Sequence, residues 1–167
     1  MGKSSKPKSV LMVCVDNISR SPIAEAVLHD AICKLGLQNE WRVDSAAIEG
    51  WNLGAKPDPR ALSVLRHHNI EYYSCARRLV LDDFDKFDYI LGMDQSNMAS
   101  LKLLMPHYSN ATLLLLSDFL FGFEPNHRAI EDPYYDIGEA PFEKIFEQCS
   151  YACSSFLKQA RRNQIVI

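Results

Sequence analysis

Apolar residues along the chain form short strand-like runs that alternate with longer segments of helical spacing. Residues 9–15 are almost continuously apolar, which is typical of a strand buried on both faces of a parallel sheet. The pattern predicts further strands over 41–47, 87–93 and 111–116. Apolar positions three or four residues apart predict helices at 22–36, 59–68, 95–105 and 141–162.

Alternating strands and helices predict an α/β fold, a doubly wound, four-stranded parallel sheet with helices on both faces and three layers in all. A chain of 167 residues with 47% hydrophobic residues is large enough for one domain with its own core. We therefore expect a single domain over residues 1–167, preceded only by a flexible basic tail at 1–8. In such sheets ligands bind at the carboxyl ends of the strands, where residue 14 lies.

Charge and composition narrow the function and the location of the protein. The formal net charge of -3 and the pI near 5.9 argue against a nucleic-acid partner, because nucleic-acid binding depends on excess Lys and Arg. The chain has no apolar run of 18 residues and no apolar core of a signal peptide near its start, so we expect a cytoplasmic protein without membrane insertion. Five cysteines without a C-x-x-C pair indicate reduced thiols, and Cys149 and Cys153, one helical turn apart, are expected in the core.

The segment CVDNISRS, residues 14–21, has the composition of an anion site with a nucleophile. A short loop entering a helix offers backbone N–H groups and the positive end of the helix dipole to one anion. The same field lowers the pKa of a cysteine, so Cys14 is predicted to be a thiolate at neutral pH. Arg20 suits a bidentate phosphate contact, and Ser21 suits a hydroxyl bond to the sulfur. From spacing alone, a buried strand cysteine, a surface arginine and a helix-capping serine remain an alternative.

Several further segments, in order along the chain, resemble the low-molecular-weight protein tyrosine phosphatases. The loop is similar to the signature of that family, and EDPYY at 131–135 is similar to its acid loop. Similar segments between them are WRVDSAA at 41–47, PDPR at 57–60 and DYILGMD at 88–94.

The resemblance implies a two-step phosphatase without a metal or other cofactor. Cys14 would attack phosphorus and Asp132 would protonate the leaving phenol oxygen, after which Asp132 would activate the water that hydrolyses the cysteinyl-phosphate. Arg20 would clamp the phosphate, and Ser21 would stabilise the thiolate. The implied partners are a phosphotyrosine-containing protein and phosphate or other tetrahedral oxyanions. Read alone, Asp132 is a turn residue before proline.

The resemblance also implies substrate-binding and supporting residues. The substrate would contact the phosphate loop and an aromatic cleft, through Val15, Asp16, Asn17, Ile18, Ser19, Trp51, Tyr134 and Tyr135. Four residues would support the loop, with the last two of them pairing near the active site, namely Ser45, Glu25, His68 and Asp94. Where the family has a second histidine in this network the chain has Ser74, which predicts weaker support.

Two loop positions depart from the family pattern, since Asp16 replaces a glycine and Ser19 replaces a cysteine. A carboxylate about 7 Å from a unit of phosphate charge, at an effective dielectric near 20, costs roughly 2 kcal/mol, and it raises the pKa of Cys14. We therefore keep two hypotheses, a slow or selective phosphatase and a pseudophosphatase that binds phosphotyrosine or a protein without turnover. A third, arsenate reduction, requires relay cysteines, and Ser19 and the lone Cys75 argue against it.

Overall fold

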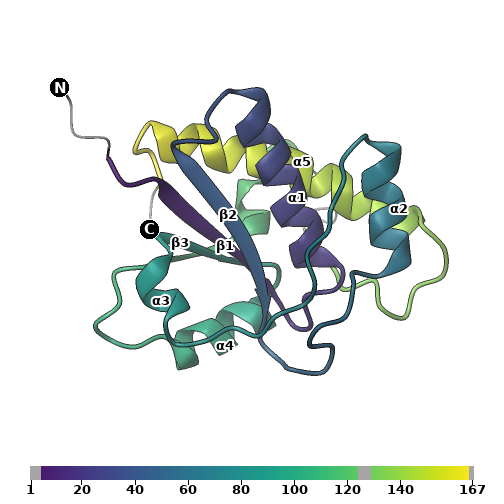
Figure 1. The fold of residues 1–167 in the computed structure, drawn as a ribbon, viewed down its shortest axis with the longest axis horizontal. Coiled ribbons are helices and arrows are strands. Elements are labelled where there is room, and N and C mark those ends of the chain that lie inside the picture. The colour runs from purple at the N-terminus through teal and green to yellow at the C-terminus, as the bar shows by residue number, and fades with distance from the viewer. Residues whose placement is uncertain (1–4, 124–128, 166–167) are drawn as a thin grey trace.

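The protein is seen in a computed structural model that describes residues 5–123 and 129–165. Its centre is one parallel sheet with the strand order β2-β1-β3-β4 (Figure 1). The strands are β1 (Lys8–Cys14), β2 (Trp41–Ala47), β3 (Tyr89–Gly92) and β4 (Thr112–Leu115). The predicted fold class is confirmed.

Helices cover both faces of the sheet. The face with α1 and α5 also contacts α2 and the short 3-10 helix η1, whereas α3 and α4 pack on the opposite face. Figure 1 shows this three-layer arrangement, with α1 and α5 on one side and α3 and α4 on the other. The bounds are α1 (Arg20–Lys34), α2 (Pro59–His67), α3 (Asp83–Lys86), α4 (Gln95–Leu104), η1 (Leu116–Phe119) and α5 (Ala140–Arg161).

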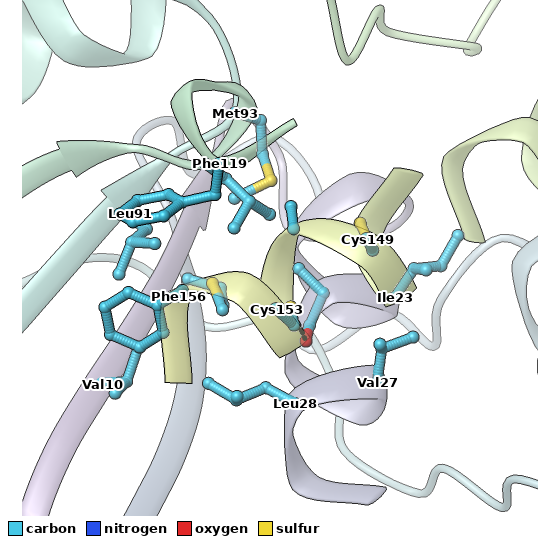
Figure 2. Close-up of a cluster of buried hydrophobic side chains, with 14 of the residues drawn as sticks. Val10, Ile23, Val27, Leu28, Leu91, Met93, Phe119, Cys149, Cys153 and Phe156 are labelled. Carbon is cyan, nitrogen blue, oxygen red and sulfur yellow. Dashed lines mark hydrogen bonds between the residues drawn. The ribbon is translucent and has the colours of Figure 1, made fainter. Parts of the chain in front are cut away.

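The alternation of side chains along β1 divides the core into two clusters. Val10 and Met12 face α1 and α5, and Leu11 and Val13 face α3 and α4. All four are fully buried, which explains why this strand is apolar at consecutive positions. Figure 2 shows the first cluster, in which Phe156 lies beside Val10.

The buried cysteines of α5 pack against α1. Cys149 and Cys153 are both 0% exposed, as predicted for core residues. The thiol of Cys153 lies 3.7 Å from the carbonyl oxygen of Ala24 in α1. Figure 2 places both thiols near Ile23 and Val27 of that helix.

The predicted elements agree with the observed ones to within two residues at each end. The strand over 41–47 and the start of the helix at 59 match the structure fully. The short elements α3 and η1 were not predicted. Part of the predicted tail, residues 1–4, lies outside the described residues, and Lys8 already belongs to β1. Of the helices in the described part of the chain, none is both long and apolar enough to cross a membrane.

The sheet reverses its winding direction between β1 and β3. From β1 the chain moves outward to β2, and β3 then pairs on the other side of β1. The carboxyl ends of these two strands therefore form the switch point at which such folds bind ligands. Cys14 ends β1, and Asp94 follows β3.

Candidate active site

The predicted phosphate loop, residues 15–19 and called the phosphate loop below, joins β1 directly to α1. It turns through Asn17, whose φ of 59° lies in the left-handed region that asparagine tolerates better than most residues. α1 begins at Arg20, so the free N–H groups of its first turn lie next to the loop. Arg20 and Ser21 are almost fully buried, as is Cys14. The three residues of the predicted chemistry are thus brought together around one turn of chain.

Asn17 fixes the shape of the loop through its side-chain amide. Its Nδ2 donates hydrogen bonds to the hydroxyls of Ser21, at 2.8 Å, and Ser45, at 2.9 Å. Its Oδ1 accepts the backbone N–H of Arg77 at 3.1 Å. One side chain therefore links the loop, α1, β2 and the segment before α3.

The sulfur of Cys14 lies 2.9 Å from the hydroxyl oxygen of Ser21. Burial raises the pKa of the Cys14 thiol, and this effect outweighs the Arg20 guanidinium and the Ser21 hydroxyl and amide, which lower the pKa. The charge of Asp16 raises it further. Loss of hydration is therefore the largest influence on the pKa of Cys14, and it acts in the opposite direction to the lowering by loop amides and arginine that the sequence predicts.

Arg20 lies between two carboxylates of the site, those of Asp94 and Asp132. Its Nη1 donates to Oδ2 of Asp94 at 2.7 Å and to the carbonyl oxygen of Ile130 at 3.1 Å. Its Nη2 lies 3.8 Å from Oδ2 of Asp132. The arginine of the phosphate loop thus lies beside the predicted general acid, from which it is separated by 112 residues of sequence.

Asp16 lies inside the site rather than in solvent. Its residue exposure is only 6%, and burial raises the pKa of its carboxyl, as does the charge of Asp132. Hydrogen bonds from the backbone N–H groups of Ile18 and Asp16 itself favour the charged form, and so does Arg20. The Asp16 carboxyl group therefore interacts with the same kinds of group, loop amides and Arg20, that are predicted to bind an oxyanion.

A buried polar network supports the loop from β2 and α1. The Ser45 hydroxyl donates to Oε1 of Glu25 at 2.8 Å, and the hydroxyl of Tyr72 lies 3.4 Å from that of Ser45. Burial raises the pKa of Glu25 to about 7. Burial raises the pKa of the Tyr72 phenol as well, and the charge of Glu25 adds to the rise.

Tyr72 is a residue that the sequence analysis missed. It interacts with Glu25, with Ser45 and with Ser74, the residue that stands at the position of the family histidine in the sequence. The prediction of weaker support for the phosphate loop rested on Ser74 alone and did not include the Tyr72 hydroxyl. Its role has no local sequence signal, because Glu25 and Ser45 are far from it in the chain.

The predicted pair of His68 and Asp94 is wrong. Nε2 of His68 lies against Oε1 of Glu143, and its ring stacks on Phe146 with 3.8 Å between centroids. Asp94 instead pairs with Arg20 and caps α4 by accepting the N–H of Asn97. Both residues match the family pattern, but each has a different partner, Glu143 for His68 and Arg20 for Asp94.

The aromatic residues predicted to line the cleft are exposed to solvent. Trp51 lies just after residues 48 and 49, whose backbone N–H groups donate hydrogen bonds to the carbonyl oxygens of residues 14 and 15. Tyr134 and Tyr135 meet edge to face with centroids 4.8 Å apart. The N–H of Tyr134 donates to Oδ1 of Asp132 at 3.1 Å, which connects this aromatic pair to the acid.

The charged residues of the site do not form a metal cluster in the described ranges. Within residues 5–123 and 129–165, no group of three or more His, Cys, Asp or Glu side chains is arranged to hold a metal ion. The polar groups around Cys14 include the Ser21 hydroxyl and the Arg20 guanidinium, which suit an oxyanion, and the carboxyl group of Asp16, which opposes one.

A cysteine, an arginine and an aspartate around such a loop define the class of cysteine-dependent phosphatases. The model of the low molecular weight phosphotyrosine protein phosphatases matches residues 9–165, so the chain belongs to this family of hydrolases.

Known proteins agree with this assignment over nearly the whole chain. The low molecular weight phosphotyrosine protein phosphatase 2 of Drosophila melanogaster is 58% identical, over 99% of this chain and 100% of its own length. A solved protein tyrosine phosphatase of Entamoeba histolytica, with Hepes in its active site, has a TM-score of 0.88 and 29% identity, and the match covers 95% of this chain and 99% of that one. DARP, a Drosophila arginine phosphatase, has a TM-score of 0.85 and 34% identity, with coverage of 91% and 97%.

Proposed function

We propose that this enzyme hydrolyses phosphotyrosine in proteins, and simple aryl phosphates, through a cysteinyl-phosphate intermediate. The observation that carries the proposal is the position of Arg20, which is buried beside the loop that holds Cys14 and lies 3.8 Å from Asp132. A phosphoryl group bound by the loop amides and Arg20 has a nucleophile on one side and a proton donor on the other.

The first step transfers the phosphoryl group to sulfur. The Cys14 thiolate forms an S–P bond while the P–O bond to the tyrosine ring breaks, and Asp132 gives its proton to the departing phenol oxygen. Arg20 and the loop amides stabilise the charge on the three other oxygens.

The second step returns the enzyme to its starting state. The Asp132 carboxylate takes a proton from water as the water oxygen bonds to phosphorus, and the S–P bond breaks. Ser21, 2.9 Å from the sulfur, stabilises the departing thiolate with its hydroxyl. Inorganic phosphate is the second product, and no redox partner enters the balance.

We propose that Asp16 slows this reaction without abolishing it. Its carboxylate shares the loop amides with the substrate and raises the pKa of Cys14. Asp16→Asn removes the charge while keeping a side chain of similar size, and Asp16→Gly restores the family residue. Both variants are expected to raise kcat/KM for 4-nitrophenyl phosphate about tenfold, consistent with roughly 1.4 kcal/mol of relieved repulsion.

Two measurements test the function and the role of Asp16 separately. Wild-type protein should turn over 4-nitrophenyl phosphate and a phosphotyrosine peptide, and Cys14→Ser should lose both activities. The pH midpoint of iodoacetamide alkylation at Cys14 should move down in Asp16→Asn, because the thiolate becomes easier to form. An unchanged midpoint would contradict the proposed role of Asp16.

The buried carboxylate also favours a second candidate, a pseudophosphatase that binds phosphotyrosine or a protein partner without turnover. It predicts negligible wild-type turnover, oxyanion binding that persists, and activity that appears in Asp16→Gly. A phosphoarginine peptide belongs in the same assay, because one structural relative is an arginine phosphatase. Faster hydrolysis of phosphoarginine than of phosphotyrosine would reject the proposed substrate.

We also propose that the enzyme acts in the cytoplasm. Its five cysteines are free thiols, two of them exposed, which suits a reducing compartment.

A further inference from the structure

Arg60, near the amino end of α2, donates four side-chain hydrogen bonds although it is partly exposed. Its Nε and Nη2 donate to the two carboxylate oxygens of Asp58, at 3.1 and 2.9 Å. Asp58 is also the N-cap of α2 and accepts the N–H of residue 60 at 2.9 Å. The guanidinium is therefore held in a bidentate pair at a fixed point of the fold.

From this point Arg60 reaches the acid loop. Its Nη1 donates to the carbonyl oxygen of Asp136 at 2.5 Å, and its Nη2 lies 3.5 Å from the carbonyl oxygen of Tyr134 as a second, longer bond. The guanidinium carbon lies 4.4 Å from the ring centroid of Phe142, in a cation–π contact. One side chain thus contacts the carbonyl of Tyr134 in the acid loop, the carbonyl of Asp136 directly after the loop, and the start of α5.

The other side of Asp58 faces the phosphate loop. Its backbone N–H donates to the carbonyl oxygen of Ile18 at 2.7 Å. A continuous set of hydrogen bonds therefore runs from Ile18 through Asp58 and Arg60 to the acid loop. The two loops of the reaction come from segments more than 100 residues apart and meet at the amino end of α2.

Two arginines thus hold the chain on either side of Asp132. Arg20 binds the carbonyl of Ile130, two residues before it, and Arg60 binds the carbonyl of Tyr134, two residues after it. We propose that Arg60 is a positioning residue that holds the acid loop in register with the phosphate loop, so that Asp132 meets the leaving oxygen. This inference rests on the proposed role of Asp132 as general acid.

The geometry requires an arginine. The planar guanidinium group of Arg60 donates four hydrogen bonds in different directions, and one face of the same group covers the ring of Phe142. A lysine keeps the charge, but its three N–H donors all start from one nitrogen, so it cannot span the Asp58 carboxylate and the carbonyls of Tyr134 and Asp136 together. Arg60→Lys is therefore the informative change, because it separates charge from geometry.

The experiment compares aryl phosphates whose leaving groups differ in basicity. A general acid matters most when the leaving phenol is basic, so a displaced Asp132 should harm phenyl phosphate far more than 2,4-dinitrophenyl phosphate. Arg60→Lys is expected to lower kcat/KM for phenyl phosphate about 10- to 100-fold, and for the dinitrophenyl ester by less than about threefold. Arg66→Lys, an exposed arginine on the same helix, is the matched control and should change neither value.

A double variant shows whether the effect passes through the acid. In an Asp132→Asn background the acid is already lost, so adding Arg60→Lys should cause little further loss with phenyl phosphate. Asp58→Asn is a second, independent variant, since asparagine still caps the helix but pairs less strongly with the guanidinium. It should show the same dependence on leaving group, to a smaller degree.

The outcomes distinguish this inference from the proposed function. If Asp132→Asn has the wild-type dependence on leaving group, the acid role fails and the inference fails with it. If Asp132→Asn steepens the dependence while folded Arg60→Lys and Asp58→Asn do not, only the positioning role of Arg60 is overturned. Equal losses for both esters in Arg60→Lys, or a full additional loss in the double variant, would also overturn it.

Discussion

At the scale of single residues, Glu25 shows how burial sets the charge of one group in the site. Its residue exposure is 9%, and it accepts the hydroxyl hydrogen of Ser45. Loss of hydration is the largest effect and raises its pKa from 4.5 to about 7, with the charge of Asp44 adding to the rise. Near neutral pH the network that supports the phosphate loop therefore changes charge at this residue.

The raised pKa of Glu25 makes stability depend on pH in a definite direction. Between pH 4.5 and about 7 the folded state binds the proton and the unfolded state releases it, so the free energy of unfolding falls as pH rises through this window. The loss is on the order of 3 kcal/mol. Glu25→Gln should lack this component of the pH dependence, whereas Glu147→Gln, at an exposed position, should keep it. Urea unfolding across this pH range measures the difference, and parallel curves for wild type and Glu25→Gln would contradict it.

At the scale of elements, residues 77–79 of the segment before α3 run parallel to the end of β2 and form backbone hydrogen bonds with it. The N–H of Ala47 donates to the carbonyl of Arg77, and the N–H of Leu79 donates to the carbonyl of Ala47, both at 2.8 Å. The side chain of Arg77 pairs with Asp44 and Asp83, which fixes the segment on both sides. The segment thus brings the Arg77 amide to Asn17 and the Tyr72 phenol to the loop network.

We expect the Tyr72 hydroxyl to contribute to catalysis through this network. Tyr72→Phe removes a partner of Ser45 and Glu25, so Asn17 is held less firmly and kcat/KM should fall about two- to tenfold. Stability should fall by about 1 kcal/mol, a typical value for one hydrogen bond. Tyr73→Phe is the control, because the neighbouring ring is 83% exposed and its hydroxyl binds only Glu71 among the described contacts. Steady-state kinetics should separate the two variants, and equal activities would exclude a role for Tyr72.

The elements were predictable from sequence because their signals are local, and the site was predictable only in part. Cys14, Arg20 and Ser21 lie on one strand, loop and helix, so their spacing suggested an anion site with a nucleophile, and the family resemblance was needed to choose this over a purely structural role. Asp132 became a candidate only through the family resemblance. Tyr72 and Arg60 could not be assigned from the sequence, because their partners are distant in the chain. Ser45 is 27 residues from Tyr72. Tyr134 and Asp136 are 74 and 76 residues from Arg60.

At the scale of the whole molecule, the candidate active site and the aromatic cluster around Phe156 lie toward opposite ends of the sheet. The carboxyl ends of β1 and β3 carry Cys14 and Asp94, whereas Trp41 and Tyr89 begin β2 and β3 at their amino ends. There the ring of Phe156 meets Trp41 and Tyr89 edge to face, with centroids 6.3 and 5.3 Å away.

Phe156 is therefore expected to affect folding without affecting the reaction. It is fully buried beside Val10, four residues before Cys14, a separation of about 13 Å along an extended strand. Phe156→Ala should lower the free energy of unfolding by about 3–5 kcal/mol, and Phe156→Leu by less, because a smaller cavity remains. At temperatures where the variants are folded, kcat/KM for 4-nitrophenyl phosphate should stay within about twofold of wild type, since distant sites act independently. Urea unfolding and kinetics on the same samples test this separation, and a loss of kcat/KM that grows with the loss of stability would show that the two ends of the sheet are coupled.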